Sequence, residues 1–319
     1  MTAAGGAHAS GHPLVSLVIP TFRRADRVSA ALASIREPNL APEDLQVIVV
    51  DNASGDHIAD VVAGFQSEFA DLSLHVSDTN VGPIENWRRG IALATAPWTK
   101  ILWSDDLLEE RSIEYFLAAA ERNSARVITS RVAVDYENGR SVDRYLDRPT
   151  TLTPNVVISE LLHFPAGLTS SPGAALVRTE DARAALEASL PEPCLRRAIG
   201  PDLLITYWGV FAGGVGIHLP DVLARFSAGE DSITVRTPRA ILSSCYVAAM
   251  DYLVKMNNAP ITVTTQRRMR SRAALDSLLG GEKSALISPR RLSLRATVYD
   301  TWQISRHWFS TLILRKRTI

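Results

Sequence analysis

Two adjacent carboxylates, Asp105 and Asp106, follow directly on a short apolar run, Trp98 to Trp103. A run of this length is typical of a buried strand in a parallel sheet, which puts the two acids at its carboxyl end. Two carboxylates in one crevice repel each other unless a cation lies beside them, so a divalent metal is the natural counter-charge. Asp105 and Asp106 are therefore the candidate metal ligands. The alternative is that Ser104 or one of the acids caps a helix expected from about residue 108 to 123.

A third acid, Asp51, ends the apolar run Leu45 to Val50 and so also lies at the carboxyl end of a predicted strand. In a nucleotide site Asp51 could accept a hydrogen bond from a base N–H, and Phe22 could offer a ring face to the base. Because Asn, Ser and Gly follow Asp51, the carboxylate could instead stabilise a turn of its own backbone. Both interpretations stay open from the sequence.

Four apolar runs and three segments with helical periodicity must position these side chains. Strands and helices alternate along the first hundred residues, which predicts a parallel sheet with right-handed crossovers and with its loops opening onto one rim. No Gly-x-Gly-x-x-Gly or Gly-Lys-Ser/Thr motif follows the first strand, so a dinucleotide fold and a P-loop are excluded. The expected strands are Leu14 to Ile19, Leu45 to Val50, Leu72 to Val76 and Trp98 to Trp103, and the expected helices are Ala25 to Arg36, His57 to Phe69 and Ile84 to Ala94.

Composition restricts the partners and the compartment. The 319 residues carry a formal net charge of zero, which argues against a nucleic-acid partner. Cys194 and Cys245 have no metal-ligand spacing and suggest neither a disulfide framework nor a zinc site, so a reduced, cytoplasmic compartment is expected. Residues 1–12 are rich in Ala, Gly and Ser and are predicted to be a disordered tail. No segment has the length and apolarity of a transmembrane helix.

Four blocks, in this order and at compatible spacing, resemble the nucleotide-binding half of the family 2 inverting glycosyltransferases of the GT-A fold. They are Val15 to Arg24, Val47 to Gly55, Asn80-Val-Gly82 with Glu85 to Arg89, and Trp103 to Asp106. The resemblance implies an α/β fold with a Rossmann-like, mostly parallel central sheet flanked by helices. It also implies a domain over residues 13–237, divided into a nucleotide-binding half (13–106) and an acceptor half (107–237).

The resemblance implies roles for individual residues. Its nucleotide-binding positions are Thr21, Phe22, Arg23, Asp51, Asn80, Gly82, Ser104 and Asp105. Asp105, with Asp106 beside it, matches the end of the family's Asp-x-Asp motif and would hold Mn²⁺ or Mg²⁺ on the donor diphosphate. Trp103 stands where the family often has the first Asp. Either Asp106 takes over part of that role or the metal binds more weakly, and the sequence does not choose between these alternatives.

A fourth acid, Asp202, heads an apolar segment after Gly200 and Pro201, which suits the first turn of a helix. An acid there can serve as a cap or a dipole partner. The resemblance, however, places the general base at this point, and an inverting transfer needs one carboxylate to take the acceptor hydroxyl proton. Asp202 is the candidate catalytic base.

Three later segments are less specific. Leu168 to Arg178 resembles the family's small-residue loop beside the donor sugar, although a plain turn before an edge strand fits it as well. Residues 140–154 are polar and are predicted to be a loop. His218, on a predicted strand, is expected to be a buried and satisfied side chain and no ligand.

From residue 238 to 319 the chain is predicted to be a helical appendage, with helices near residues 240–256, 265–279 and 289–314. The last of these interleaves basic residues with Trp302, Trp308 and Phe309. A basic amphipathic helix can lie on an anionic membrane, which would suit a lipid-linked acceptor. The alternative is a packing helix or the contact of a homodimer.

Taken together, the sequence predicts a metal-dependent inverting glycosyltransferase that moves a sugar from a UDP- or dTDP-sugar to a hydroxyl of a glycan, a lipid-linked sugar or a small molecule. It is expected in the cytoplasm or peripherally on the inner face of the membrane. Two alternatives remain: a non-catalytic sugar-nucleotide-binding protein of the same fold, and a sugar-1-phosphate nucleotidyltransferase. The second lacks support, because the loop Pro20 to Arg24 is not the Gly-rich basic loop that such enzymes carry after the first strand.

Overall fold

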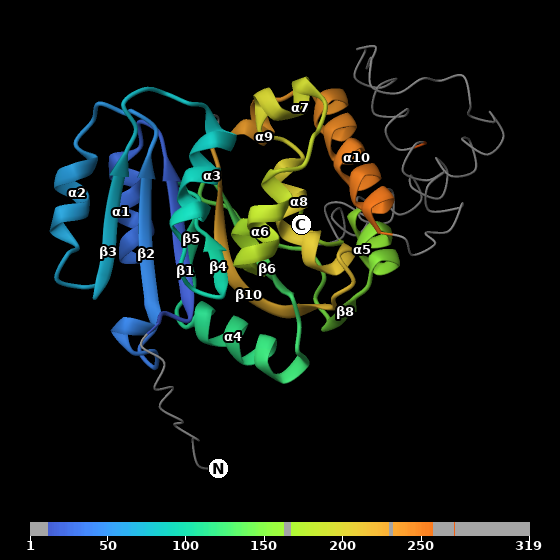
Figure 1. Ribbon diagram of the computed structural model, residues 1–319, viewed down its shortest axis with the longest axis horizontal. Helices are drawn as coiled ribbons and strands as arrows, with labels where there is room; N and C mark the ends of the chain where they lie inside the picture. Colours follow the sequence, from blue (N-terminus) through green and yellow to red (C-terminus); the bar gives the residue numbers. More distant parts are fainter. Residues whose placement is uncertain (1–11, 163–166, 230–231, 258–270, 272–319) are drawn as a thin grey trace.

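The computed structural model of the protein describes residues 12–162, 167–229, 232–257 and 271 (Figure 1). Within these residues one mixed sheet runs through the molecule in the strand order β3-β2-β1-β4-β9-β6-β10-β5, with β7 on β6 and β8 on β10. The predicted α/β fold with a mostly parallel central sheet is confirmed. The predicted tail, residues 1–11 at least, lies outside the described residues.

The first half of the sheet has the predicted alternation. Strands β1, β2, β3 and β4 are parallel, and residues such as Thr21 and Asp51 stand side by side at their carboxyl ends. Helix α2 is shorter than expected, and β4 stops two residues before Trp103. The elements are β1 Val15–Thr21, α1 Ala25–Ala33, η1 Pro42–Asp44, β2 Leu45–Asp51, α2 Ile58–Gly64, β3 Asp71–Val76, α3 Pro83–Leu93 and β4 Trp98–Ile101.

The second half of the sheet is mixed. Strand β9 is antiparallel to both β4 and β6, while β10 is parallel to β6 along most of its length. The segment 140–154, predicted to be a loop, contains two short strands that extend the sheet, because β7 pairs with β6 and β8 with β10. The strands are β5 Leu107–Leu108, β6 Val127–Tyr136, β7 Ser141–Arg144, β8 Thr150–Leu152, β9 Ala175–Arg178 and β10 Gly216–Ala228.

Helices cover both faces of the sheet. Because side chains alternate along a strand, Leu17 and Val47 pack with α1, α2 and α4 on one face, while Val18 and Ile48 pack with α3, α6 and α8 on the other. Strands β1 and β2 are therefore buried from both sides, and their loops are held rigidly at the rim. The remaining helices are α4 Ser112–Asn123, α5 Pro154–Leu161, η2 Pro172–Ala174, α6 Thr179–Leu186, α7 Glu192–Arg197, α8 Pro201–Phe211, α9 Ile233–Arg236 and α10 Arg239–Met256.

Helix α10 begins the predicted helical region and runs beside α8 (Figure 1). Cys245, Ala249 and Leu253 of α10 are fully buried in the same core as α8. The boundary expected at residue 237 stays a prediction, as do the helices near 265–279 and 289–314, which lie outside the described residues together with their basic and aromatic side chains. Among the described residues, no helix has the length and apolarity needed to cross a membrane.

Candidate functional site

Asp51, at the end of β2, is completely buried and holds the loop that follows it. Its Oδ2 accepts a hydrogen bond from the Ser54 N–H at 2.9 Å, and its Oδ1 accepts one from the Ser54 hydroxyl. Ser54 Oγ in turn accepts a hydrogen bond from the Arg23 N–H at 2.7 Å. The structure thus has the turn-stabilising arrangement that the sequence left open, and this turn ties the loop after β2 to the loop after β1.

Asn80 and Gly82 lie on a third loop that joins the same rim. Asn52 donates a hydrogen bond to Asn80 Oδ1 at 2.9 Å, and its own Oδ1 accepts one from the Val81 N–H at 2.8 Å. Gly82 precedes α3 with a φ of 82°, a conformation that favours glycine. The loops carrying Thr21, Asp51 and Asn80 are therefore bound to one another by side-chain hydrogen bonds.

Thr21 is the residue of this rim whose polar group is unsatisfied. Its side chain is 4% exposed, and its Oγ1 has no hydrogen-bond partner among the described residues. A buried hydroxyl without a partner costs about 1–3 kcal/mol, so its presence points to a partner supplied from outside the chain. Beside it, Phe22 is 37% exposed, with the Arg23 guanidinium 5.0 Å from its ring centroid.

Asp105 and Asp106 follow β4 in two different environments. Asp105 Oδ2 lies 2.7 Å from Arg24 Nη1 and 3.6 Å from Arg27 Nη1, both on or next to α1. Asp106 is buried, and its Oδ1 accepts a hydrogen bond from the Ser227 N–H at 3.1 Å. Burial and the neighbouring Asp105 raise the pKa of Asp106 well above its usual range, against the opposing effects of the Ser227 N–H, Lys100 and Arg24.

The alternative role for Ser104, Asp105 and Asp106 as a helix cap is wrong. Helix α4 begins only at Ser112, and the carboxylate of Glu37 accepts hydrogen bonds from the N–H groups of the first turn at 2.8 and 3.1 Å. Burial raises the pKa of Glu37 to about 7. The cap comes from a residue far away in sequence, which leaves the acids after β4 available for another role.

Lys100 lies behind the acid pair on β4 and was not predicted as a site residue. It is completely buried, its ammonium group donates to the Gly173 carbonyl oxygen, and burial lowers its pKa to about 7 against the opposing charge of Asp106. The sequence feature that could have identified it is a lysine inside an otherwise apolar strand. Lys100 connects the strand that ends at the acids to the small-residue loop before β9.

Trp103 also contacts this small-residue loop. Its indole Nε1 donates to Ser171 Oγ at 2.9 Å, and its rings lie 4.8 Å from those of Trp87. A Cβ on Gly173 would lie 3.0 Å from Trp103, so the close approach of loop and indole depends on a glycine there. Trp103 therefore packs the loop 168–174 against β4.

Asp202 heads α8, as predicted. Its Oδ1 accepts a hydrogen bond from the Gly200 N–H at 2.8 Å, and its Oδ2 accepts one from the Tyr246 hydroxyl at 2.9 Å. Burial raises the pKa of Asp202 to about 6, although both hydrogen bonds oppose the shift. A carboxylate with this pKa is ionised at neutral pH and is basic enough to take a proton.

Tyr145 joins the acid pair to Asp202. Its pKa is raised by burial and by the charges of Asp106 and Asp202, so both carboxylates lie within electrostatic range of one phenol. Tyr145 has a φ of 76°, which is unusual for a bulky residue and is the kind of strain that clusters at functional sites. No hydrogen bond connects Asp51, Asp105 and Asp202 directly within the described part of the chain.

No cluster of three or more His, Cys, Asp or Glu side chains that could hold a metal ion occurs among the described residues. Asp105 and Asp106 can still provide carboxylate oxygens, which suit Mg²⁺ and Mn²⁺. An ion with two protein ligands takes its remaining ligands from water and from substrate phosphates, so the pair fits a metal that arrives with a diphosphate.

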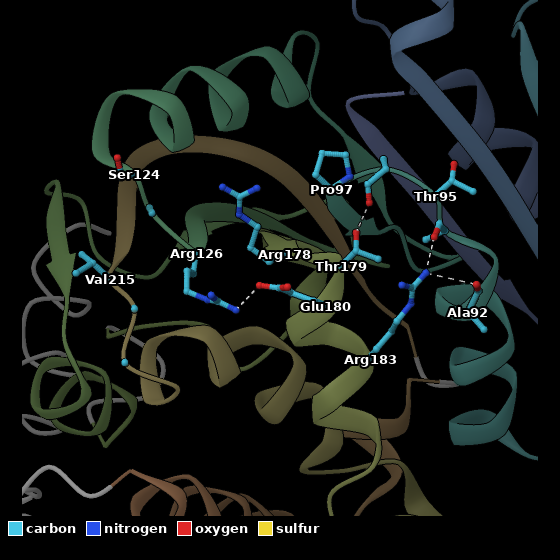
Figure 2. Close-up of a pocket in the computed structure, with 15 residues that line it drawn as sticks. Ala92, Thr95, Pro97, Ser124, Arg126, Arg178, Thr179, Glu180, Arg183 and Val215 are labelled. Atoms are coloured by element: carbon cyan, nitrogen blue, oxygen red, sulfur yellow. Dashed lines mark hydrogen bonds and ion pairs between the residues drawn. The ribbon is translucent and has the colours of Figure 1, made fainter. Parts of the chain in front are cut away.

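A cavity of about 1020 Å³ lies at the opposite rim, where β4, β6 and β10 begin (Figure 2). None of the predicted site residues lines it. Its three arginines have structural partners: Arg126 pairs with Asp181 and Glu180, Arg183 donates to the Ala94 carbonyl at 2.6 Å, and Arg178 lies 4.0 Å from the Trp98 ring. This cavity is separate from the candidate site.

Two further expectations have clear outcomes. His218 is buried and satisfied as predicted, with one ring nitrogen 2.9 Å from Thr129 Oγ1 and the other 2.8 Å from the Leu146 carbonyl oxygen. Cys194 and Cys245, far apart in sequence, meet in the core as free thiols that are hydrogen-bonded to each other.

Solved structures resemble this fold. Residues 1–349 of TarS from S. aureus, in complex with UDP-GlcNAc, match with a TM-score of 0.62 and 16% sequence identity, covering 92% of this chain and 81% of that chain. The mannosyltransferase PcManGT from Pyrobaculum calidifontis, in complex with GDP-Man and Mn²⁺, matches with a TM-score of 0.55 and 15% identity, covering 92% and 80%. At these identities the likeness concerns the fold alone.

Sequence relatives match over shorter stretches. A PGL/p-HBAD biosynthesis glycosyltransferase of Mycobacterium tuberculosis is 32% identical over 98 residues, covering 31% of this chain and 38% of that protein. The poly(ribitol-phosphate) beta-N-acetylglucosaminyltransferase TarP of Staphylococcus aureus is 25% identical over 132 residues, covering 41% and 39%. The matched stretch thus spans less than half of either relative. The model of glycosyl transferase family 2 matches residues 16–179, about half of the chain, from β1 to the start of α6. The chain belongs to glycosyl transferase family 2.

Proposed function

We propose that this protein transfers a sugar from a nucleoside diphosphate sugar to an acceptor hydroxyl, with inversion at the anomeric carbon and with a divalent cation, Mn²⁺ or Mg²⁺. The observation that carries the proposal is the gathering of one unpartnered hydroxyl and four acidic side chains around one rim. The unpartnered Thr21 hydroxyl lies beside the Asp51 turn, the Asp105–Asp106 pair follows the adjacent β4, and Asp202 lies within reach of Tyr145.

The donor base belongs at the three joined loops. Thr21 and Asp51 offer polar groups, Phe22 and the Arg23 guanidinium offer faces for stacking, and Asn80 and Gly82 close the other side. UDP or dTDP is the preferred donor nucleotide. The names of both neighbours are consistent with a nucleoside diphosphate sugar as donor, UDP-GlcNAc for TarS and GDP-Man for PcManGT, and of the two only TarS fits the preference for UDP or dTDP.

The diphosphate belongs beside Asp105 and Asp106. When bound there, a divalent cation would neutralise the leaving diphosphate. Arg24 is paired with Asp105 at 2.7 Å, so its guanidinium lies beside the proposed diphosphate position and could contact a phosphate oxygen. Ser104 is buried and directly precedes the pair.

Asp202 acts as the general base. The acceptor O–H bond breaks, its proton moves to a carboxylate oxygen of Asp202, and the oxygen electron pair forms the new bond to the anomeric carbon. The bond from that carbon to the diphosphate breaks, and the diphosphate leaves with the electron pair. Attack opposite the leaving group inverts the configuration.

A non-catalytic sugar-nucleotide-binding protein is the second candidate. Trp103 favours it, because the indole is occupied by Ser171 and Trp87 and offers no carboxylate at the first position of the Asp-x-Asp motif. Slow hydrolysis of a donor sugar nucleotide in the presence of Mn²⁺ would identify an enzyme, and binding without any hydrolysis or transfer would identify a binder.

A thermal-shift screen of UDP, GDP, dTDP, CDP and their sugar conjugates, with and without Mn²⁺, tests the proposal. Binding to the native state at a hundred times Kd stabilises by about 2.7 kcal/mol, so one nucleotide should raise Tm by several degrees, and more with Mn²⁺. Asp105→Ala should remove the Mn²⁺-dependent part, while Asp26→Ala, an exposed acid on α1, should not. The proposal fails if no nucleotide changes Tm, and the metal site fails if Asp105→Ala behaves like the wild type.

A further inference from the structure

Helix α10 brings a phenol to the carboxylate that heads α8. The Tyr246 hydroxyl donates to Asp202 Oδ2 at 2.9 Å, while the other carboxylate oxygen is held by the Gly200 N–H at 2.8 Å. Tyr246 lies 44 residues after Asp202 and well beyond residue 179, where the family match ends. Each carboxylate oxygen of Asp202 therefore has a partner fixed by the fold.

Helix α10 is packed firmly enough to hold this contact. Gly200, with a φ of 104°, lies so close to α10 that an added Cβ would be 3.2 Å from the Cys245 carbonyl oxygen and 3.4 Å from Ala249 Cβ. Cys245 and Ala249 are both completely buried. The turn that starts α8 and the middle of α10 thus form one packed unit around Asp202.

A second set of hydrogen bonds fixes the other side of the same unit. The Tyr207 hydroxyl donates to the Thr169 carbonyl oxygen at 2.6 Å, and Thr206 Oγ1 donates to the Ser170 carbonyl oxygen at 3.1 Å. The Ser170 side chain also hydrogen-bonds the Tyr246 phenol. Because Ser170 donates to Tyr246 and Tyr246 donates to Asp202, a hydroxyl relay runs from the small-residue loop to the carboxylate.

We propose that Tyr246 is a positioning residue that holds and tunes Asp202, and that α10 is thereby part of the reaction site. This inference depends on the proposed function, in which Asp202 accepts the acceptor proton. Tyr246 keeps its own proton throughout: burial and the Asp202 charge raise its pKa well above the usual range. Its role is to stabilise the ionised carboxylate and to fix its orientation.

The proposal predicts a specific pH effect. The titratable groups that interact with Asp202 are Tyr246 and Cys245 on α10 and Tyr145 after β7. Of these, Tyr246 is the one that donates a hydrogen bond to the ionised form, which lowers the pKa of Asp202. Without this bond the pKa of Asp202 rises, so the base is protonated over a wider range of pH.

Tyr246→Phe tests the inference, and Tyr252→Phe is its matched control. Tyr252 lies on the same helix and packs against Trp208, with ring centroids 6.1 Å apart, away from Asp202. A hydrogen bond to a charged group is worth about 1.5–3 kcal/mol, so Tyr246→Phe should lower kcat roughly tenfold or more. The acidic limb, which is the fall of kcat/KM at low pH, should move to a higher pH by about one unit. The KM for the donor should be unchanged, and Tyr252→Phe should alter neither kcat nor the limb.

Ser170→Ala gives a second, milder test if Tyr246→Phe folds poorly. Losing the donor to Tyr246 weakens the relay, so the limb should move in the same direction by less. The inference is overturned if the acidic limb stays in place in these variants. A fall in kcat and Tm without a shift of the limb would show a purely structural role. If Asp202→Asn is as active as the wild type, the proposed function itself fails. If Asp202→Asn is inactive and the limb does not move in Tyr246→Phe or Ser170→Ala, only the role of Tyr246 fails.

Discussion

Asp51 and Asp202 are carboxylates that the fold holds in opposite ways. Asp51 is held by Ser54, three residues later in the same turn. Asp202 shares its carboxylate between Gly200, two residues earlier, and Tyr246, which arrives on a helix from the end of the described chain. The position of Asp51 is thus fixed by a local turn, and the position of Asp202 depends also on tertiary packing.

This difference has chemical consequences. The Asp51 carboxylate accepts a hydrogen bond from Ser54 at each oxygen and so holds the turn at the rim. The Asp202 carboxylate is placed where burial raises its pKa to about 6, which costs stability when the group is ionised. We therefore expect Asp51 to stabilise the fold. Ionised Asp202 should destabilise it, because the burial that makes the carboxylate more basic also disfavours its charge.

The largest expected effect comes from Asp202→Asn on transfer. An amide cannot take a proton from the acceptor, so the transfer rate should fall by about 10²–10⁴-fold. Nucleotide affinity should change less than twofold, because Asp202 is not in the loops that hold the base. Asp221→Asn, an exposed acid on β10, is the control and should keep full activity. Loss of nucleotide binding together with activity would contradict the assignment of Asp202 as the base.

A smaller effect concerns the free energy of unfolding, which should change in opposite directions when the two carboxylates are replaced. In the folded state the pKa of Asp202 is about 6, against an ordinary value of 3.8. The contribution of the protonated group to stability is therefore complete below pH 3.8 and is lost as the pH rises through 6. At pH 8 Asp202→Asn should therefore raise the free energy of unfolding by about 1–2 kcal/mol, and at pH 4 the gain should vanish. Asp51→Asn should lower it by about 1–2 kcal/mol at pH 8, because one strong acceptor in the turn is lost.

Urea unfolding of both variants at the two pH values measures this contrast. If Asp202→Asn destabilises the protein at pH 8 as Asp51→Asn does, the two carboxylates have the same structural role. The distinction between a rigid rim and a tuned base would then be wrong.

The sequence predicts the local part of this molecule well. The alternation of strands and helices from residue 14 to 103, the rim loops and the position of Asp202 at the start of a helix follow from periodicity, turn residues and the resemblance of four blocks. In these cases the partners lie within a few residues of one another or at the ends of neighbouring parallel strands.

What the sequence did not predict depends on contacts between distant segments. Glu37 caps α4 across 76 residues, and Tyr246 reaches Asp202 across 44. Strands β7 and β8 are short and polar, and they form because β6 and β10 offer them edges. Such partners are chosen by tertiary packing, which overrides the local preference for loops.

We propose that the nucleotide, the acid pair and Asp202 share one rim of the sheet. A crystal structure with UDP or dTDP, whichever raises Tm more, and with Mn²⁺ tests it most directly. We expect the base among Thr21, Phe22 and Asp51, the cation on Asp105 or Asp106, and Asp202 facing the space beyond the diphosphate. A nucleotide bound in the cavity of Arg126 and Arg178 at the opposite rim, with Asp105 still paired to Arg24, would contradict it.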